Sequence, residues 1–514
     1  MHVRQVKLKV TKQQRHKLNK MFYIAYKIYV ICVKKAQKEL RLLKRNQRYK
    51  YLIHLYVIIK QEISKLEEDK SKLTSKKKSD KEQIKVIETQ LKENKNKLKN
   101  IKSELNKITN NYCLNRTKLE KYLTVQSHKY KHILTSSEVQ RIADNVAKAV
   151  NKYLYGNGKA VHIKKYNEFN TIAQKTDNGF KYNGYDIIFM NQRFKLKGNI
   201  KVKPDSIATI ELNRIEFNNG YEYYIKFIIK EAQPQRLVAG KNEGGIDPGV
   251  STMAIATDDT CILEELAPKC KEYNKKIAHL QKLLDISIRT TNPSAYNAEG
   301  RIKKGTKLKY SKHAKYLKRK IRVLYRKKSN YTECLHRNLA NRIIKNCNKL
   351  KIETMDYKAL AKRSKNVERS DKSTEIKNKD GSIKEVYKYK KRKRFGKSIN
   401  DRSSGLFIKI LTNKCELYEV KIKNINTSKV KASKYNHKTN KYEEHKLSER
   451  TKLIGKDLVQ RDLYSAFLIK NVNDDLETID QSKCKKEFKK YLENQEKEIT
   501  RIKNAGIKNK NFGF

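Results

Sequence analysis

The chain lacks the paired cysteines that mark zinc ribbons and disulfide frameworks. Its eight cysteines are dispersed over 514 residues, and no two of them form a Cys-x-x-Cys pair. This spacing argues against a four-cysteine zinc site and against a disulfide scaffold. We therefore expect reduced, mostly buried thiols and no structural zinc.

Long hydrophobic runs are absent as well. The N-terminal sequence MHVRQVK has no apolar core of the kind found in signal peptides, and the most apolar stretch, Met21–Val33, is interrupted by Lys27. A helix that spans a bilayer needs about 20 consecutive apolar residues. These features predict a cytoplasmic protein without a membrane partner.

Acidic residues are scarce relative to basic ones, and tryptophan is absent. The chain has 54 Asp and Glu residues and 121 Lys and Arg residues, so its formal net charge is +67. Its 31 Tyr and 13 Phe are scattered among the lysines. Positive charge along the whole chain favours a polyanionic partner, and aromatic rings among lysines suit base stacking. A lysine-rich composition from an AT-rich genome would explain part of the lysine count but not the shortage of acids.

The first 240 residues have the pattern of a small β-barrel with a helical insertion. Residues 3–10 alternate polar and apolar like a strand, and short strands punctuated by Gly and Asn turns follow between 159 and 233. Helical periodicity fills the sequence between them. We predict a barrel domain at 1–11 and 156–240, with a helical domain at 12–155 inserted between its first two strands.

A heptad pattern within this insertion predicts an antiparallel coiled-coil hairpin at about 52–110. Apolar residues recur at 4-3 spacing from Leu52 to Leu73 and again from Ile84 to Ile108, with a polar, turn-like stretch between them. Two interpretations stay open for the hairpin: a plain arm or dimerisation stalk, or a basic arm along a nucleic-acid duplex. Whether the protein is a monomer or a homodimer is undecided.

A new unit begins at Gly244. Its pattern predicts three antiparallel strands followed by helix, strand, helix, strand and helix, which is the element order of RNase H-type domains. We assign this α/β domain to 241–427 and 456–474. Residues 428–455 form an insertion, and residues 475–514 form a charged helical tail without catalytic features. The predicted fold class is therefore multidomain α+β.

Three carboxylates fall at the ends of elements in this second half. Asp247 in GGIDPG ends the first strand, Glu353 in KIETM follows a later strand, and Asp462 in QRDLY starts the last helix. Each alone could be an ordinary turn, surface or helix-capping acid. Their joint order is the one that an RNase H-type phosphodiesterase needs to hold two divalent cations. We predict these three residues as catalytic and as ligands of Mg²⁺ or Mn²⁺.

Other acids nearby are poorer candidates. Asp258 and Asp259 lie on a turn past the second strand, and Asp356 lies three residues beyond Glu353. We expect Asp401 and Asp457 to cap helices.

The sequence resembles the TnpB family of transposon-encoded nucleases and their relatives, the miniature type V CRISPR effectors. GIDPGV, LHRNLANRIIKNCNKLKIETMDYKAL and QRDLYSAFLI are similar to the regions of the family's three RuvC motifs, and FGKSINDRSSGLFIKILTNKCELYEVKIKNINTSK resembles the stretch before the third. The strand, helical insertion and barrel resemble the family's wedge and recognition domains. The resemblance covers most of the chain.

Two features depart from the family pattern. Family members usually carry a four-cysteine zinc ribbon after a Thr-Ser step, whereas the segment after Thr427-Ser428 has no cysteine, and His437 and His445 cannot form a tetrahedral site alone. The Asn that usually lies two residues after the third acid is Tyr464 here. Neither departure removes a carboxylate of the triad.

The resemblance implies an RNA-guided DNA endonuclease that binds a guide RNA from its own locus and a target DNA. Several runs of basic residues fit nucleic-acid binding, although they could equally be charges exposed to solvent. The predicted nucleic-acid-binding residues are Lys303, Lys304, Lys318, Arg319, Lys320, Lys388, Lys390, Lys391, Arg392, Lys393 and Arg394. Three further interpretations stay open, namely a guide-bound repressor without cleavage, a stand-alone RNA-binding protein, and a CRISPR-associated effector of the same fold.

Overall fold

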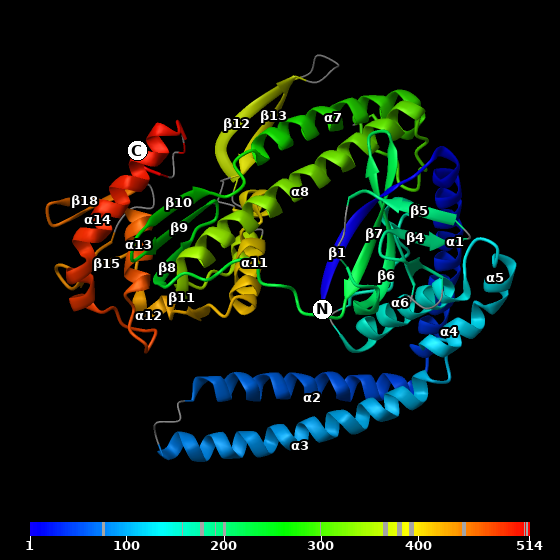
Figure 1. Cartoon of the computed structure of the whole chain (residues 1–514), viewed down its shortest axis with the longest axis horizontal. Helices are drawn as coiled ribbons and strands as arrows, with labels where there is room; N and C mark the ends of the chain where they lie inside the picture. Colours follow the sequence, from blue (N-terminus) through cyan, green and yellow to red (C-terminus); the bar gives the residue numbers. More distant parts are fainter. Residues whose placement is uncertain are drawn as a thin grey trace. The chain divides into compact units, whose positions relative to one another are not determined.

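The computed structural model forms two compact units, Met1–Ala232 and Gln233–Phe514 (Figure 1). It describes the whole chain except residues 74–77, 157, 175–178, 191, 199–201, 299, 363–368, 378–382, 390–394, 445–448, 508, 510 and 511. No helix in the described ranges is long and apolar enough to cross a membrane.

The first unit is built on a seven-stranded antiparallel sheet in the order β2-β6-β7-β1-β5-β4-β3. Its strands are β1 (His2–Lys9), β2 (Thr171–Gln174), β3 (Lys181–Tyr182), β4 (Asp186–Phe189), β5 (Gln192–Leu196), β6 (Ile207–Phe217) and β7 (Gly220–Ile229). Strand β1 lies in the centre, although every other strand follows residue 170. The sheet is curled but open, because β2 and β3 are its edges in the described part of the chain. Of the two forms that the strand pattern allows, a closed barrel and a half-barrel, the structure has the half-barrel.

Helices fill the chain between β1 and β2, as the periodicity predicted: α1 (Lys12–Leu43), α2 (Gln47–Lys72), α3 (Lys78–Thr109), α4 (Arg116–Tyr122), α5 (Thr124–Lys129) and α6 (Ser136–Tyr155). Helix α1 begins at a capping box, in which Thr11 and Gln14 bond each other's backbone N–H groups. The apolar stripes of α1 and α6 share one core with the sheet, where Phe22 and Val146 are buried together with Phe227.

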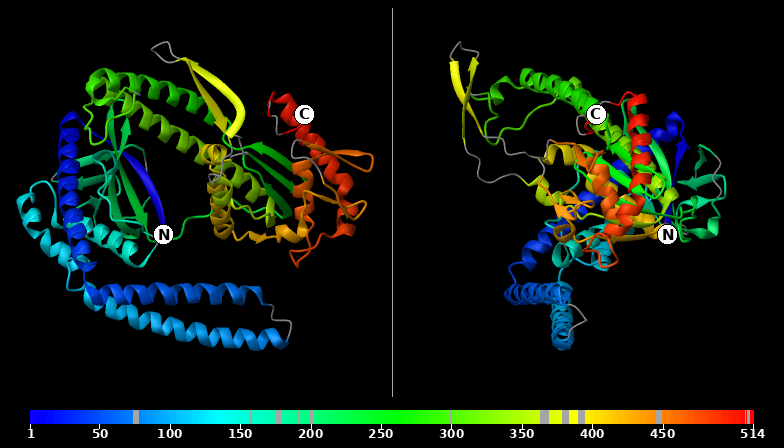
Figure 2. Two further views of the ribbon diagram at one scale, coloured as in Figure 1. Left: turned by 180° about the vertical axis from the view of Figure 1, so that it is seen from behind. Right: turned by 90° about the vertical axis from the view of Figure 1, so that its left-hand side faces the viewer.

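Helices α2 and α3 form the predicted helical hairpin and lie side by side in all three views (Figures 1 and 2). Seam positions that are buried include Leu52, Tyr56, Ile63, Leu91 and Leu105. Ion pairs between described side chains of the two helices include Arg48–Glu104 (2.9 Å), Lys70–Glu88 (2.6 Å) and Glu67–Lys95 (3.1 Å). The turn was predicted at 74–81, but α3 already begins at Lys78, so the prediction was too long at its C-terminal end. Residues 74–77 lie outside the described residues.

The second unit is built on a five-stranded sheet in the order β10-β9-β8-β11-β14. Its strands are β8 (Asn242–Pro248), β9 (Thr252–Thr257), β10 (Cys261–Glu265), β11 (Cys347–Ile352) and β14 (Lys421–Asn424). The first three strands are antiparallel neighbours, whereas β11 runs parallel to β8 and β14 runs parallel to β11. This is the succession of strands that the sequence predicted.

Helices cover both faces of this sheet. Ile246 and Ile255 face a core formed with α8 (Lys312–Asn346) and α11 (Ser404–Leu417), and α7 (Cys270–Thr291) packs on α8. Ala254 and Ala256 face the opposite core, formed with α13 (Arg461–Lys470) and α14 (Gln481–Asn504). The alternation of side chains along the strands therefore sorts them between two helical layers.

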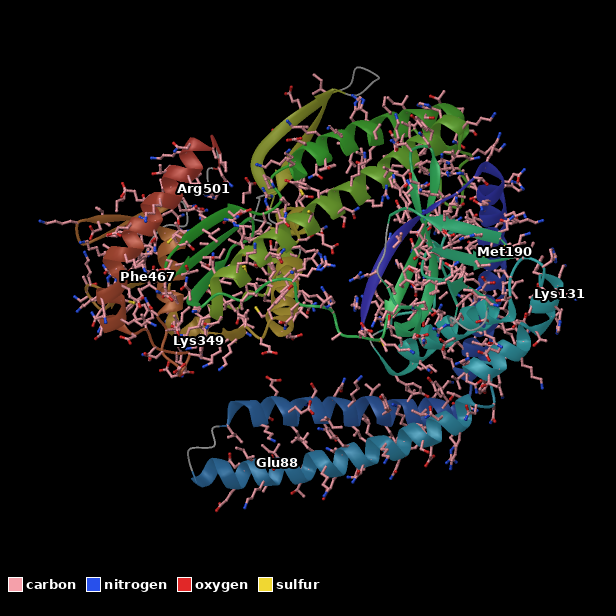
Figure 3. All side chains as sticks on the ribbon, in the orientation of Figure 1. Glu88, Lys131, Met190, Lys349, Phe467 and Arg501 are labelled. Carbon is pink, nitrogen blue, oxygen red and sulfur yellow. The ribbon has the colours of Figure 1, made fainter. Side chains whose placement is uncertain are left out.

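Helix α14 is an integral part of the second unit, although the sequence indicated a charged tail. Phe467 of α13 and Arg501 of α14 are both labelled in Figure 3; Phe467 is buried, and its ring stacks on that of Tyr491 at 4.6 Å. Arg501 donates to Glu498, which in turn accepts the backbone N–H of Leu263 at 2.8 Å. Few apolar residues lie on one face of α14, so the sequence did not indicate that this helix packs on the core.

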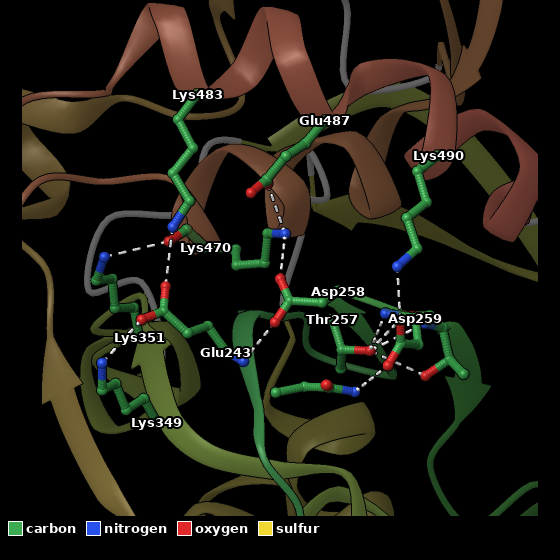
Figure 4. A network of polar contacts seen from close by, with 12 residues as sticks. Glu243, Thr257, Asp258, Asp259, Lys349, Lys351, Lys470, Lys483, Glu487 and Lys490 are labelled. Atoms are coloured by element: carbon green, nitrogen blue, oxygen red, sulfur yellow. Dashed lines mark hydrogen bonds and ion pairs between the residues drawn. The ribbon is translucent and has the colours of Figure 1, made fainter.

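A polar network ties α13 and α14 to the start of β8 (Figure 4). Glu243 accepts hydrogen bonds from Lys349 at 3.1 Å and from Lys483 at 2.9 Å. The Lys470 side chain is only 3% exposed and pairs with Asp258 at 2.8 Å and with Glu487 at 2.7 Å. The buried ammonium is thus compensated by two carboxylates, as a buried charge requires.

Several segments differ from the sequence prediction. The long loop before α11 contains α9 (Tyr357–Ala361), α10 (Gly396–Arg402) and a hairpin of β12 (Arg369–Lys377) and β13 (Ile383–Tyr389). The insertion holds α12 (Thr427–Val430), β15 (Tyr435–Asn436), β16 (Lys441–Tyr442), β17 (Thr451–Ile454) and β18 (Asp457–Gln460). Helix α13 (Arg461–Lys470) starts directly after this hairpin, because residues 457–460 pair with β17.

Two acids that were expected to cap helices have other roles. Asp401 accepts hydrogen bonds from Asn274 at 2.8 Å and from Lys328 at 2.6 Å. Asp457 belongs to a strand and pairs with Lys438 at 2.7 Å.

Glu138 is a buried carboxyl in the first turn of α6. It is 1% exposed, and its Oε2 accepts the backbone N–H of Thr135 at 2.7 Å. Burial raises the pKa of Glu138 from 4.5 to about 8. Between these two values the folded protein keeps a proton that the unfolded chain has lost, so folding stability falls as pH rises through this window.

Replacing Glu138 by Gln should remove this dependence, because the amide oxygen keeps the cap without titrating. We expect the melting temperature of Glu138→Gln, relative to the parent protein, to rise steadily from pH 5 to pH 8. The limiting slope for one group is about 1.4 kcal/mol per pH unit. The exposed Glu62 on α2 provides the control Glu62→Gln, and an equal trend in both variants would contradict the assignment.

Candidate active site

Strands β8 and β11 place Asp247 beside Glu353. Ile246 and Ile352 are partners in the parallel register, and the N–H of Glu353, one residue on, donates to the Ile246 carbonyl at 3.3 Å. Ile246 and Ile352 face the α8 and α11 core. Because side chains alternate along a strand, Asp247 and Glu353 face the layer that contains α13.

Helix α13 brings Asp462 to the same side. The side chain of Gln460 caps the helix by accepting the N–H of Leu463 at 2.7 Å, so Asp462 lies within the first turn and is not the capping residue. A carboxylate in the first turn is stabilised by the helix dipole.

Gly245 lets α13 approach β8 closely. A Cβ atom at this position would lie 2.1 Å from the carbonyl oxygen of Ala466 and 2.3 Å from the nitrogen of Lys470. Any side chain here would push the helix backbone away from the strand. The glycine therefore determines how near Asp462 comes to Asp247.

The charges of the other two carboxylates reach Asp247 and affect its protonation. Burial raises the pKa of Asp247 well above its usual range, the charges of Asp462 and Glu353 raise it further, and Arg461 opposes the shift. Burial also raises the pKa of Glu353. Within the described part of the chain, neither Asp247 nor Glu353 accepts a hydrogen bond or forms an ion pair through its carboxylate. Partly buried acids of this kind are stabilised by a proton or by a cation.

Asp462, in contrast, has two arginine partners. Arg461 donates to its Oδ1 through Nε at 3.2 Å and Nη2 at 3.1 Å, and Nη1 of Arg450 lies 3.5 Å from its Oδ2. Among the residues that the structure describes, no three His, Cys, Asp or Glu side chains are placed as a metal-binding group. The fold thus gathers the three carboxylates but leaves Asp462 paired with cations of the protein.

Two hydroxyl groups that the sequence did not single out hold the turn after Asp247. Tyr357 Oη donates to the Gly249 carbonyl at 3.3 Å, and Ser404 Oγ donates to the Val250 carbonyl at 2.7 Å. Burial and the charge of Asp247 raise the pKa of Tyr357, which shows that its phenol lies near the carboxylate. No periodic signal in the sequence marks either residue.

The predicted nucleic-acid-binding residues lie on other elements. Lys303 and Lys304 are exposed between α7 and α8. Lys318 and Lys320 lie beside Arg319 on α8 and sit over the rings of Tyr310 and Tyr316, at 3.1 Å and 4.5 Å from the ring centroids. Lys388 is on β13, but its side chain and all of Lys390, Lys391, Arg392, Lys393 and Arg394 lie outside the described residues, as does His445.

Comparisons with known proteins give structural likenesses only. No family model matches the chain, and no curated protein matches it. A cryo-EM structure of a Cas12f1–sgRNA–target DNA complex aligns with a TM-score of 0.40 at 12% identity, over 91% of this chain and 98% of that chain. A cryo-EM structure of a CRISPR-Cas12f ternary complex aligns with a TM-score of 0.23 at 15% identity, over 70% of this chain and 75% of that chain. Both TM-scores are below 0.5, and neither likeness contributes to the argument for function.

Gly245→Ala tests the close contact between α13 and β8. The added methyl group should force the helix away and lower the free energy of unfolding by about 1–3 kcal/mol, with a loss of any activity that depends on Asp462. Gly405→Ala in α11 is the matched control, since its Cβ would meet only Tyr357 at 3.7 Å. Equal thermal stability of both variants would contradict the assigned role of Gly245.

Proposed function

We propose that the chain is an RNA-guided, metal-dependent DNA endonuclease of the TnpB type, with Asp247, Glu353 and Asp462 as its catalytic carboxylates. The observation that carries the proposal is the convergence of these three acids at the carboxyl ends of β8 and β11. The sheet order β10-β9-β8-β11-β14 supports an RNase H-type, or RuvC-like, domain at 241–427 and 456–474.

The donor atoms of this site fit Mg²⁺ or Mn²⁺, because all three side chains offer hard carboxylate oxygens. Two such cations, when bound, activate a water molecule and stabilise the leaving oxygen of a phosphodiester. The parallel pairing of β8 with β11 holds Asp247 and Glu353 in fixed positions. To bind a cation, Asp462 would give up its contacts with Arg461 and Arg450. Arg461 would keep its hydrogen bond to the Glu449 carbonyl at 2.9 Å.

The guide RNA and the target DNA enter the proposal through the resemblance of the motifs and through the net charge of +67. The barrel segments 1–11 and 156–240 would act as a wedge domain, and 12–155 as a recognition domain. RNA–DNA pairing would supply sequence specificity, and the protein would hold the heteroduplex by its backbone. A transposon origin fits the family, and the flanking DNA of the gene would separate it from a CRISPR-associated effector.

A guide-bound DNA-binding repressor without cleavage is the second candidate. The observation that favours it is the pairing of Asp462 with Arg461 and Arg450, which leaves the three acids without a preformed cation-binding arrangement among the described residues. If these ion pairs persist in the complex with nucleic acid, the chain binds its target and does not cut it.

Plasmid cleavage distinguishes the two candidates. The protein, purified with the RNA that co-purifies from its own locus, is incubated in Mg²⁺ with a plasmid that carries the matching target beside a randomised flank. We expect cleavage that Asp247→Ala, Glu353→Ala and Asp462→Ala each reduce by about a thousandfold, equivalent to about 4 kcal/mol of transition-state stabilisation.

Asp356→Asn is the matched control for this experiment. Asp356 is an exposed acid near Glu353 that caps α9 through the N–H groups of Lys358 and Ala359, so its amide variant should cleave like the parent. Guide-dependent binding without cleavage would establish the repressor instead.

A further inference from the structure

The insertion between β14 and α13 reaches the core of the second unit through His437. This residue follows β15 and is 1% exposed. Its ring lies 4.5 Å from the ring of Phe488, 5.8 Å from that of Tyr464 and 6.2 Å from that of Phe467, measured between centroids. A polar side chain buried among three aromatic rings needs a specific partner.

That partner is Tyr464 of α13, which is itself fully buried. The backbone N–H of His437 donates to the Tyr464 oxygen at 3.2 Å, and Nδ1 of the same histidine lies 2.8 Å from that oxygen. Since the phenol already accepts the backbone N–H, we assign its proton to the bond with Nδ1. Gln481, the first residue of α14, donates to the His437 carbonyl at 2.7 Å. The insertion is therefore bonded to both helices of this layer.

Tyr464 lies two residues beyond Asp462. The insertion also forms hydrogen bonds with Arg461, the residue before Asp462 in the same helical turn. The backbone N–H of Arg461 donates to the Arg450 carbonyl at 2.9 Å, and its Nη1 donates to the Glu449 carbonyl at 2.9 Å. The insertion thus contacts α13 on both sides of Asp462. The phenol oxygen of Tyr464 takes part in both hydrogen bonds with His437.

The chemistry of His437 argues against two other roles. Burial lowers its pKa to about 4, so the ring is neutral near pH 7 and is no switch between pH 5 and 8. Its Nδ1 is occupied by the phenol, and no metal-binding group of His, Cys, Asp or Glu occurs within the described ranges. The remaining role is geometric.

We propose that His437 and Tyr464 are positioning residues, whose mutual hydrogen bonds orient the first turn of α13 so that Asp462 can share a divalent cation with Asp247 and Glu353. This inference rests on the proposed nuclease function. An error of about 1 Å in the position of a catalytic group can cost on the order of a hundredfold in rate. The buried phenol thereby links the insertion to the chemistry without touching substrate or cation.

Tyr464→Phe tests the inference, because it removes only the hydroxyl group and keeps the ring in the core. In plasmid cleavage with the guide-bound protein, we expect the maximal rate to fall on the order of tenfold and the half-saturating Mg²⁺ concentration to rise. The KM for target DNA and the binding of guide RNA should stay unchanged. If the hydroxyl group contributed only to overall stability, its removal would not change the half-saturating Mg²⁺ concentration.

Tyr435→Phe is the matched control. Tyr435 lies on β15 of the same insertion, is buried, and donates its hydroxyl proton to Asn440 at 2.8 Å without contacting α13 through that bond. Tyr435→Phe removes the same chemical group, a buried tyrosine hydroxyl, but from the insertion rather than from α13. We expect the parent's metal requirement in this variant.

Two substitutions of the histidine complete the test. In His437→Asn the amide oxygen can take the place of Nδ1 as acceptor for the phenol, and we expect it to restore most of the metal response that His437→Leu loses. The inference is overturned if Tyr464→Phe and His437→Leu keep the parent's Mg²⁺ requirement, or if Tyr435→Phe shifts it equally. Absence of cleavage by the parent protein would instead overturn the proposed function, and this inference with it.

Discussion

The contact between α13 and β8 across Gly245 is the constraint on which the second unit depends. A helix backbone 2.1 Å from the place of a missing Cβ leaves no room for any side chain. This proximity lets Phe467 and Lys470 reach the core and the polar network, and it puts Asp462 on the same side as Asp247. The absence of a side chain at Gly245 therefore determines both the packing of α13 on the sheet and the position of Asp462.

The second requirement is electrostatic. Burial and the charges of the two neighbouring acids raise the pKa of Asp247, and burial raises the pKa of Glu353. Asp462 is instead paired with Arg461 and Arg450. A divalent cation would relieve the repulsion and compete with the arginines for the third carboxylate. Under the proposed function, binding of a cation would be coupled to the orientation of α13. The buried bond between His437 and Tyr464 lies on the same turn of that helix.

Much of this arrangement could be predicted because it depends on local pattern. The heptads of α2 and α3, the alternation in β1, and the motif GGIDPG each fix an element and its end within a few residues. The succession of strands and helices in the second unit was predicted in the same way. The placement of the three acids beside one another also agrees with that order, while their catalytic role stays a proposal.

What could not be predicted depends on contacts between distant residues. The highly charged α14 looked like a tail, since only a few of its positions, such as Phe488 and Tyr491, are buried. The insertion looked like a degenerate loop, because a single histidine with a phenol partner 27 residues away has no local signature. The contact of Asp462 with Arg450 could not be predicted either. The two residues come together because β17 pairs with β18, which places Thr451 opposite Gln460.

The central claim is that Asp247, Glu353 and Asp462 together form one site for divalent cations. Fe²⁺ can replace Mg²⁺ at such oxygen-ligand sites, and ascorbate with peroxide then produces hydroxyl radicals that cut the chain next to the bound metal. Mass spectrometry of the fragments should reveal cuts near residues 247, 353 and 462 together, suppressed by excess Mg²⁺ and lost in Asp247→Ala. Cuts at other segments, or cuts that Mg²⁺ does not suppress, would contradict the account.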